Sequence, residues 1–253
     1  MHPLTGPQLA VLAVAGLVGG AANAAAGGGS MATFPVLIAL GVPPISANVT
    51  NTLGHAPGYV AIVVGLRQEL AGQRHRLRWL IPLAGCGAAA GAVLLSVTPS
   101  SVFRAAAPYL VLLACALIAL QPLLRRSITV RPGGSAPAPA LIGGLLLGCG
   151  YAGYFGAGAG FITLASLSLV LAGSLQVLNA LSRLCICVAN FVALPILLTL
   201  NSFDLTAAVT LWPTTMVGGY LGARAVRSLP EWLLRTLIIT LGLAGAAYLF
   251  IGR

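Results

Sequence analysis

The chain has 253 residues, of which 58% are hydrophobic and only 6% are charged. A soluble domain carries about 25% charged residues, so this composition excludes a soluble enzyme, a nucleic-acid-binding domain and a disordered chain. The net charge is +10, from thirteen Arg, no Lys and three acids, and most Arg stand between apolar runs, where positive charge signals orientation in a membrane.

We therefore expect a multi-pass membrane protein. The absence of Lys beside abundant Arg, Gly and Ala indicates a GC-rich genome, and hence a bacterium and its inner membrane. The apolar segments must be helical, because lipid offers no partner to an open backbone group. In chain order they are 7–26, 31–41, 45–66, 79–97, 103–124, 140–157, 161–172, 175–200, 205–223 and 232–251.

The predicted fold is an all-α polytopic membrane protein built from two homologous halves. It has eight to ten membrane helices, and two short ones follow glycine breaks. Residues 125–139 are first charged and then rich in Pro, Gly and Ser, which is typical of a linker. We expect a first repeat at 1–124, this linker, and a second repeat at 140–253.

The two halves align without a gap at an offset of 131 residues. Gly matches alone would be weak in a chain with 32 Gly, but Asn, Pro and Arg match in the same register. The matched pairs are Gly19 with Gly150, Gly27 with Gly158, Gly29 with Gly160, Asn48 with Asn179, Pro82 with Pro213, Gly87 with Gly218, Gly91 with Gly222, Pro99 with Pro230, and Arg104 with Arg235. Such duplication is how many secondary transporters are built.

Two topologies are open. If the short segments are not crossings, each half has four helices and the repeats are parallel; if they are, each has five and the repeats are inverted. With inversion and an outside N-terminus, ten Arg fall inside and two outside, against eight and four for the parallel scheme. The positive-inside rule favours inversion. An 11-residue helix rises only about 16 Å, so the short segments would be half-helices.

Each half contains a glycine turn, which we call the first glycine turn (residues 26–30) and the second glycine turn (residues 155–160). One interpretation is close helix packing through small residues. The other is a broken helix whose following half-helix presents backbone N–H groups and a positive dipole end to an anion. We expect Gly28, Gly29, Gly158 and Gly160 to bind substrate in this way.

Polar stripes follow both turns at helical spacing. The first contains Asn48, Thr52, His55 and Tyr59, and the second contains Asn179, Arg183 and Asn190, with Ser182 beside it. Ser, Thr and Asn can be interhelical hydrogen-bond partners. A guanidinium in an apolar helix stays charged and is costly, and the three acids Glu69, Asp204 and Glu231 lie near loops. Arg183 is therefore expected to bind an anion, and His55, whose imidazole titrates near neutral pH, is a candidate proton site.

These motifs resemble the TauE/SafE sulfite exporter family. The resemblance is carried by GGGS at 27–30, GVPP with the following A-N-x-T at 41–50, YAGYFGAGAG at 151–160, LNALSR at 178–183 and GGYLGARA at 218–225. Ala159 departs from the fuller glycine run of the family, whose members have seven or eight spans. The resemblance implies an inner-membrane transporter of sulfite, sulfoacetate, taurine or other sulfonates, coupled to an ion gradient.

The expected function is thus a secondary anion transporter, with a passive anion channel as the alternative. Remoter readings are an intramembrane enzyme built on Ser30 and His55, and a structural subunit. We expect no enzyme activity, no cofactor, no metal and no nucleic-acid partner. The expected partners are a small anion and the bilayer, while H⁺ or Na⁺ coupling, a homo-oligomer, the exact substrate and the direction of transport stay open. The candidate substrate-binding residues are Arg183, Asn48, Asn179, Thr52, His55, Gly28, Gly29, Gly158, Gly160, Ser182 and Asn190.

Overall fold

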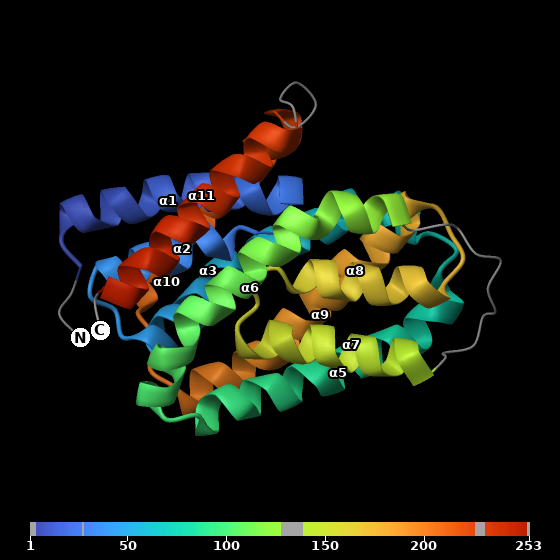
Figure 1. Cartoon of the computed structure of the whole chain (residues 1–253), viewed down its shortest axis with the longest axis horizontal. Coiled ribbons are helices and arrows are strands. Elements are labelled where there is room, and N and C mark those ends of the chain that lie inside the picture. Colours follow the sequence, from blue (N-terminus) through green and yellow to red (C-terminus); the bar gives the residue numbers. More distant parts are fainter. Residues whose placement is uncertain (1–3, 27, 128–138, 226–230, 252–253) are drawn as a thin grey trace.

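The computed structural model describes residues 4–26, 28–127, 139–225 and 231–251, and every element assigned in these ranges is a helix. Several of them, including α1, α5 and α7, lie along the long axis of the molecule (Figure 1). The prediction of an all-α protein is confirmed. In chain order the helices are α1 (Gly6–Ala26), α2 (Ser30–Ala39), α3 (Pro44–Gly65), α4 (Arg67–Leu70), α5 (Arg74–Val97), α6 (Ser100–Ser127), α7 (Pro139–Tyr154), α8 (Ala159–Val170), α9 (Leu175–Leu200), α10 (Leu205–Ala225) and α11 (Glu231–Ile251).

Each predicted apolar segment corresponds to one of these helices. The structure differs from the prediction at the connection between α3 and α5. The helix predicted to begin at residue 79 begins at Arg74, and the four-residue α4 precedes it. Hydropathy marks the apolar part of a helix, whereas the helix itself continues into the Arg-rich turn. At the predicted linker, α6 continues to Ser127 and α7 begins at Pro139, while residues 128–138 lie outside the described part of the chain.

The outer surface of the protein is apolar, as expected of a surface that faces lipid. Four described helices are long and apolar enough to cross a bilayer, and shorter apolar helices accompany them. Large apolar side chains point outward, including Leu147 and Leu169, which are 73% and 72% exposed. The four candidate spans are Gly6–Asn23, Arg74–Val97, Ser100–Leu120 and Gln176–Leu200.

The order of helices repeats along the chain. α3 and α9, α5 and α10, and α6 and α11 begin 131 residues apart, at the offset read from the sequence. α1 and α2 correspond to α7 and α8, although the starts of these helices depart from that offset by two residues. The two short helices, α2 and α8, each follow a glycine turn, as predicted.

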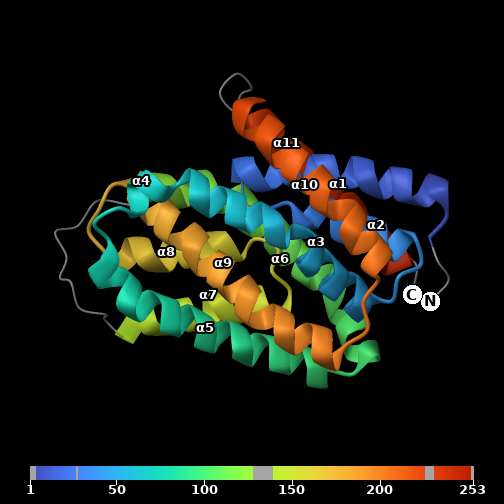
Figure 2. The ribbon, with the colours of Figure 1, turned by 180° about the vertical axis from the view of Figure 1, so that it is seen from behind.

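Packing joins helices from different repeats. α5 lies against α7 and α10 lies against α1, while α3 contacts α9 (Figures 1 and 2). The crossing of α5 with α7 and the crossing of α10 with α1 are close, because a glycine lies at each contact. A methyl group on Gly87 would lie 2.8 Å from the Leu146 carbonyl oxygen, and one on Gly218 would overlap the Leu17 carbonyl. The aligned Gly87 and Gly218 therefore serve the same purpose, which is close approach of two backbones.

The buried core consists of two apolar clusters that do not coincide with the two repeats. One lies mainly among α5, α7, α8 and α9, and Leu80 and Leu145 belong to it. The other extends over α2, α6, α10 and α11 and contains Phe34 and Phe103. The first repeat thus gives α5 to the packing of the second, and the second gives α10 to the packing of the first, so neither repeat is a separate structural unit.

Candidate functional site

The second glycine turn separates α7 from α8 by a break in the backbone. Gly156 and Gly158 have φ angles of 87° and 77°, which are left-handed conformations that side chains with a Cβ rarely adopt. The backbone N–H groups of Ala159 and Phe161 donate to the carbonyls of Gly156 and Gly158. The glycines here are required by backbone conformation, and they set the position at which α8 begins.

The guanidinium of Arg183 lies against the first turn of α8. Arg183 is half-buried on α9, and its Nη1 atom is 3.3 Å from the point where a Cβ of Gly160 would stand. The Ser182 hydroxyl donates a 2.8 Å hydrogen bond to the Gly160 carbonyl and fixes α9 to the same turn. A helix N-terminus already carries a positive partial charge, so the arrangement brings two positive centres together. An anion bound between them would stabilise both.

Asn48 connects the other repeat to this turn. Its side chain is 1% exposed, and its amide Nδ2 donates a 2.9 Å hydrogen bond to the Tyr154 carbonyl, at the end of α7. Its Oδ1 atom is buried and has no hydrogen-bond partner. Buried polar atoms are normally satisfied, so an open acceptor beside the turn indicates a place where a ligand or water binds.

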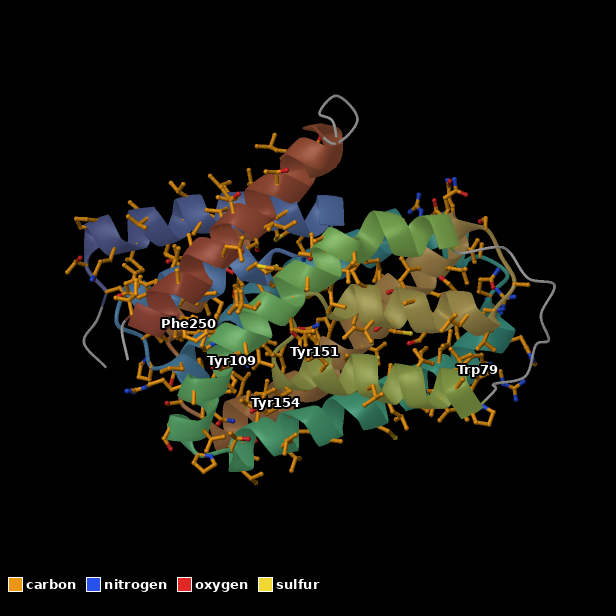
Figure 3. The ribbon with its side chains drawn as sticks, viewed as in Figure 1. Trp79, Tyr109, Tyr151, Tyr154 and Phe250 are labelled. Atoms are coloured by element: carbon orange, nitrogen blue, oxygen red, sulfur yellow. The ribbon has the colours of Figure 1, made fainter. Side chains whose placement is uncertain are left out.

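Aromatic side chains enclose the second glycine turn. The ring of Phe155 packs edge-on against Phe34 of α2 at a centroid distance of 5.1 Å, and Phe103 of α6 lies 5.8 Å from Tyr154. Figure 3 shows Tyr151 and Tyr154 where α7 ends, toward the middle of the molecule. These rings limit water around the turn, which strengthens any electrostatic interaction there.

The first glycine turn is built differently. Gly28 and Gly29 are buried, and Gly29 has an ordinary helical φ of −56°. A side chain at Gly29 would overlap the Gly19 carbonyl, so glycine is needed here for the close approach of α1 and α2. Gly27 lies outside the described residues. The two turns are equivalent in the sequence, but among their described glycines only those of the second turn have left-handed φ angles.

Polar side chains surround the first glycine turn. The Tyr59 hydroxyl on α3 is hydrogen-bonded to the side chains of Asn23 and Ser30, and the positive charge of Arg183 lies near it. The Nδ1 atom of His55, one turn before Tyr59, is 3.0 Å from the Asn51 carbonyl oxygen. Tyr59 therefore joins the surroundings of the first turn to the guanidinium at the second.

The remaining predicted site residues lie farther from these contacts or bond within their own helix. The Thr52 hydroxyl donates to the Asn48 carbonyl, and the Asn190 amide donates to the Ile186 carbonyl, both one turn earlier. Asn179, the sequence equivalent of Asn48, is half-buried near the start of α9.

Sequence reasoning did not include Asn23, Ser30 and Tyr59 among the candidate site residues. The spacing of Tyr59 from His55 placed it in the polar stripe, but nothing in the sequence showed its bonds to α1 and α2. Asn23 precedes the first glycine turn and Ser30 is its last residue, and those positions were the available signal. Within the described ranges, no group of three or more His, Cys, Asp or Glu side chains could hold a metal ion.

This chain is similar to proteins described as probable membrane transporters. A profile described as sulfite exporter TauE/SafE matches residues 12–249. The probable membrane transporter protein YfcA of Escherichia coli K12 is 30% identical over 183 residues, covering 70% of this chain and 67% of that protein. A probable membrane transporter protein of Haemophilus influenzae is 23% identical over 91% of this chain and 90% of its own length.

The probable membrane transporter protein ORF9 of a Sinorhizobium species is 31% identical, and the match spans 48% of this chain and 47% of that relative. No solved structure matches the chain. The profile covers nearly all of the sequence, including both glycine turns and both polar helices. The chain therefore belongs to the sulfite exporter TauE/SafE family of membrane transporters.

Proposed function

We propose that the protein is a secondary transporter of small sulfur-containing anions such as sulfite, sulfoacetate, taurine and other sulfonates. The observation that carries this proposal is the Arg183 guanidinium against the first turn of α8, 3.3 Å from the Cβ position of Gly160. The name of the family supports the substrate class, since it describes a sulfite exporter. The chain acts in the inner membrane of a bacterium.

The chemistry of this site suits an oxyanion with several equivalent oxygens. A guanidinium is a planar fork that can pair two oxygens of one anion, and a third oxygen can face the positive dipole end of α8. The left-handed Gly158 sets the direction in which α8 begins. A sulfonate or sulfite carries three such oxygens, whereas a carboxylate carries two.

We further propose that the two repeats are inverted and move against each other around this site. Figure 2 supports inversion, because α4 lies at one end of the molecule and the equivalent junction of α9 and α10 lies toward the other. The exchanged packing of α5 with α7 and of α10 with α1 is what a two-fold relation between the repeats would produce. Inverted repeats with a site near the membrane midplane are common in secondary transporters.

Two other functions lead to different expectations. A passive anion channel would conduct without coupling to an H⁺ or Na⁺ gradient. An intramembrane hydrolase would need Ser30 and His55 as a nucleophile–base pair. The structure instead bonds Ser30 to Tyr59 and the His55 Nδ1 atom to the Asn51 carbonyl, and this favours transport.

Ligand-induced thermal stabilisation tests the substrate class. Purified protein in detergent is heated with sulfite, sulfoacetate, taurine and isethionate, and with acetate and chloride as controls. An anion present at 100 times its Kd should raise stability by about 2.7 kcal/mol. Stabilisation by the sulfur anions and not by acetate supports the proposal, and an equal effect of all six solutes would refute it. Saturable uptake into proteoliposomes, as against flux that rises linearly with concentration, separates a transporter from a channel.

A further inference from the structure

The hydrogen bonding of His55 leaves one ring nitrogen open. Nδ1 lies 3.0 Å from the Asn51 carbonyl oxygen, and a carbonyl can only accept, so Nδ1 carries the proton of the neutral ring. Nε2 is then a lone-pair acceptor. It is buried without a hydrogen-bond partner in a residue that is 1% exposed. A bare base inside a membrane protein is a place where a proton can bind.

Nε2 points toward the contact between α1 and α2 at the first glycine turn. A methyl group on Gly19 would lie 3.5 Å from Nε2 and 3.0 Å from the Gly29 carbonyl oxygen. Asn23, one turn further along α1, is 4% exposed and also has a buried Oδ1 atom without a partner. A proton on Nε2 would therefore enter a neighbourhood that offers acceptors to it.

The second glycine turn lacks this polar environment. At the offset of 131, the polar residues around the first turn correspond mostly to apolar or aromatic ones. His55 corresponds to Ile186, Thr33 to Leu164 and Ser30 to Phe161. At one position the charged residue is in the second half instead, because Thr52 corresponds to Arg183. The equivalent turns have thus diverged into one with a neutral base and one with a fixed positive charge.

Tyr59 lies between the two environments: its hydroxyl is hydrogen-bonded to Asn23 and Ser30, and the charge of Arg183 is near it. Cys187 of α9 also lies near Tyr59. The other helices that contact α3 carry the following ionisable side chains. α1 and α2 have none, and the described side chains of α10 include only Tyr220, which is exposed. The described side chains of α6 include exposed Arg104 and Tyr109, and Cys115, whose thiol is directed at the Ile239 carbonyl. α4 has exposed Arg67, and Glu69.

We propose that Nε2 of His55 is the site at which a proton binds during transport, and that this proton couples movement of the anion at Arg183 to a pH gradient. This inference rests on the proposed anion transport and adds the identity of the coupling ion and of its site. Protonation places a second positive charge on the α3 side of Tyr59. Binding of the anion and of the proton then favour each other, because each reduces the cost of the other's charge inside the protein.

Proteoliposome transport of labelled isethionate tests the proposal. This sulfonate has no group that titrates in the range where histidine does, between about pH 5 and pH 8. Tracer exchange at equal concentrations and pH measures anion transport alone. Uptake driven by a pH difference of about one unit, with the membrane potential held at zero, measures coupling. One proton per anion allows up to about tenfold accumulation, since each factor of ten corresponds to about 1.4 kcal/mol.

The variants are His55→Asn and His55→Gln, with His75→Asn, at an exposed position, as the matched control. Asn places its amide where Nδ1 stood, so it can still donate to the Asn51 carbonyl, but neither variant has a base. Wild type and His75→Asn should exchange isethionate and accumulate it. The His55 variants should still exchange isethionate, at a rate that no longer changes with pH, and should accumulate none.

Accumulation of isethionate by the His55 variants would overturn the assignment. It would also be overturned if the wild type exchanged isethionate but did not accumulate it under a pH gradient of either sign. Loss of exchange in monodisperse His55 variants would assign His55 to anion binding and also overturn it. If the wild type exchanged neither isethionate nor sulfite, the proposed function itself would be refuted, and the coupling with it.

A measurement without variants is the ¹⁵N spectrum of labelled histidine in wild-type protein. It should contain a buried ring protonated at Nδ1 alone, and a buried ring protonated only at Nε2 would contradict the proposal.

Discussion

Replacement of Gly87 by Ala tests the close crossing of α5 and α7. The new methyl group would lie 2.8 Å from the Leu146 carbonyl oxygen and 3.2 Å from the Gly150 nitrogen. A carbon normally approaches a carbonyl oxygen to about 3.3–3.6 Å, so the two backbones must separate by roughly half an ångström or more. Both contacts are backbone atoms in helices, and neither can move aside alone. Such overpacking costs about 1–3 kcal/mol.

The assay is thermal unfolding of purified protein in detergent, followed by circular dichroism. For a chain of this size each kcal/mol corresponds to roughly 2–4 °C in Tm, so Gly87→Ala should lower Tm by about 2–12 °C. The matched control is Gly85→Ala on the same helix, where the methyl group would meet Val192 at 3.6 Å, an ordinary contact. It should unfold at or slightly above the wild-type temperature, because Ala is the better helix former. Equal stability of Gly87→Ala and Gly85→Ala would refute the account of this crossing.

Three further predictions concern the turns and the topology. Gly158→Ala forces a left-handed Ala at φ 77°, so stability should fall by about 1–2 kcal/mol and anion affinity with it, by calorimetry. Asn48→Ala removes a 2.9 Å hydrogen bond to the end of α7; it should cost about 1 kcal/mol in thermal unfolding and weaken anion binding. Single Cys residues at Gln73 and at Ser228, which lies outside the described residues, should both resist an impermeant thiol reagent in intact cells and react in inside-out vesicles.

The controls use positions away from the turns. Gly143→Ala adds a methyl group with nothing within 4 Å and should leave anion affinity unchanged. Asn201→Ala removes a 2.8 Å bond to Ser96 and should lower stability without changing affinity. Wild-type affinity in Gly158→Ala or Asn48→Ala would count against the site, and labelling of Ser228 from outside would restore four crossings in each half.

The helices were predictable because their signals are local. Apolar run length, Pro43-Pro44 before α3 and the glycines between α1 and α2 each mark an end within a few residues. The start of α5 at Arg74 was missed, because charged residues outside the lipid continue a helix without adding to hydropathy. The equivalence of the two halves was also readable, since identical residues recur in one register.

The partners of each helix could not be predicted in this way. The alignment of the halves shows that Gly87 and Gly218 are equivalent, but not that α5 meets α7 and α10 meets α1. The same holds for the site. Sequence spacing identified Asn48 and Arg183, yet the contact of Asn48 with the Tyr154 carbonyl joins residues 106 positions apart and exists only in the folded chain.

Calorimetric titration of Arg183 variants tests the central claim most directly. Sulfite and sulfoacetate are titrated into monodisperse wild-type protein, Arg183→Ala, Arg183→Lys and the control Arg104→Ala, whose side chain is exposed on α6. Truncating a charge that pairs with a ligand costs about 2–5 kcal/mol, so the Ala variant should bind at least about thirtyfold more weakly per folded molecule. Lys should restore part of the affinity, because a point charge replaces a fork that pairs two oxygens, and Arg104→Ala should bind as the wild type does. Wild-type affinity in Arg183→Ala would contradict the assignment of this guanidinium to the anion.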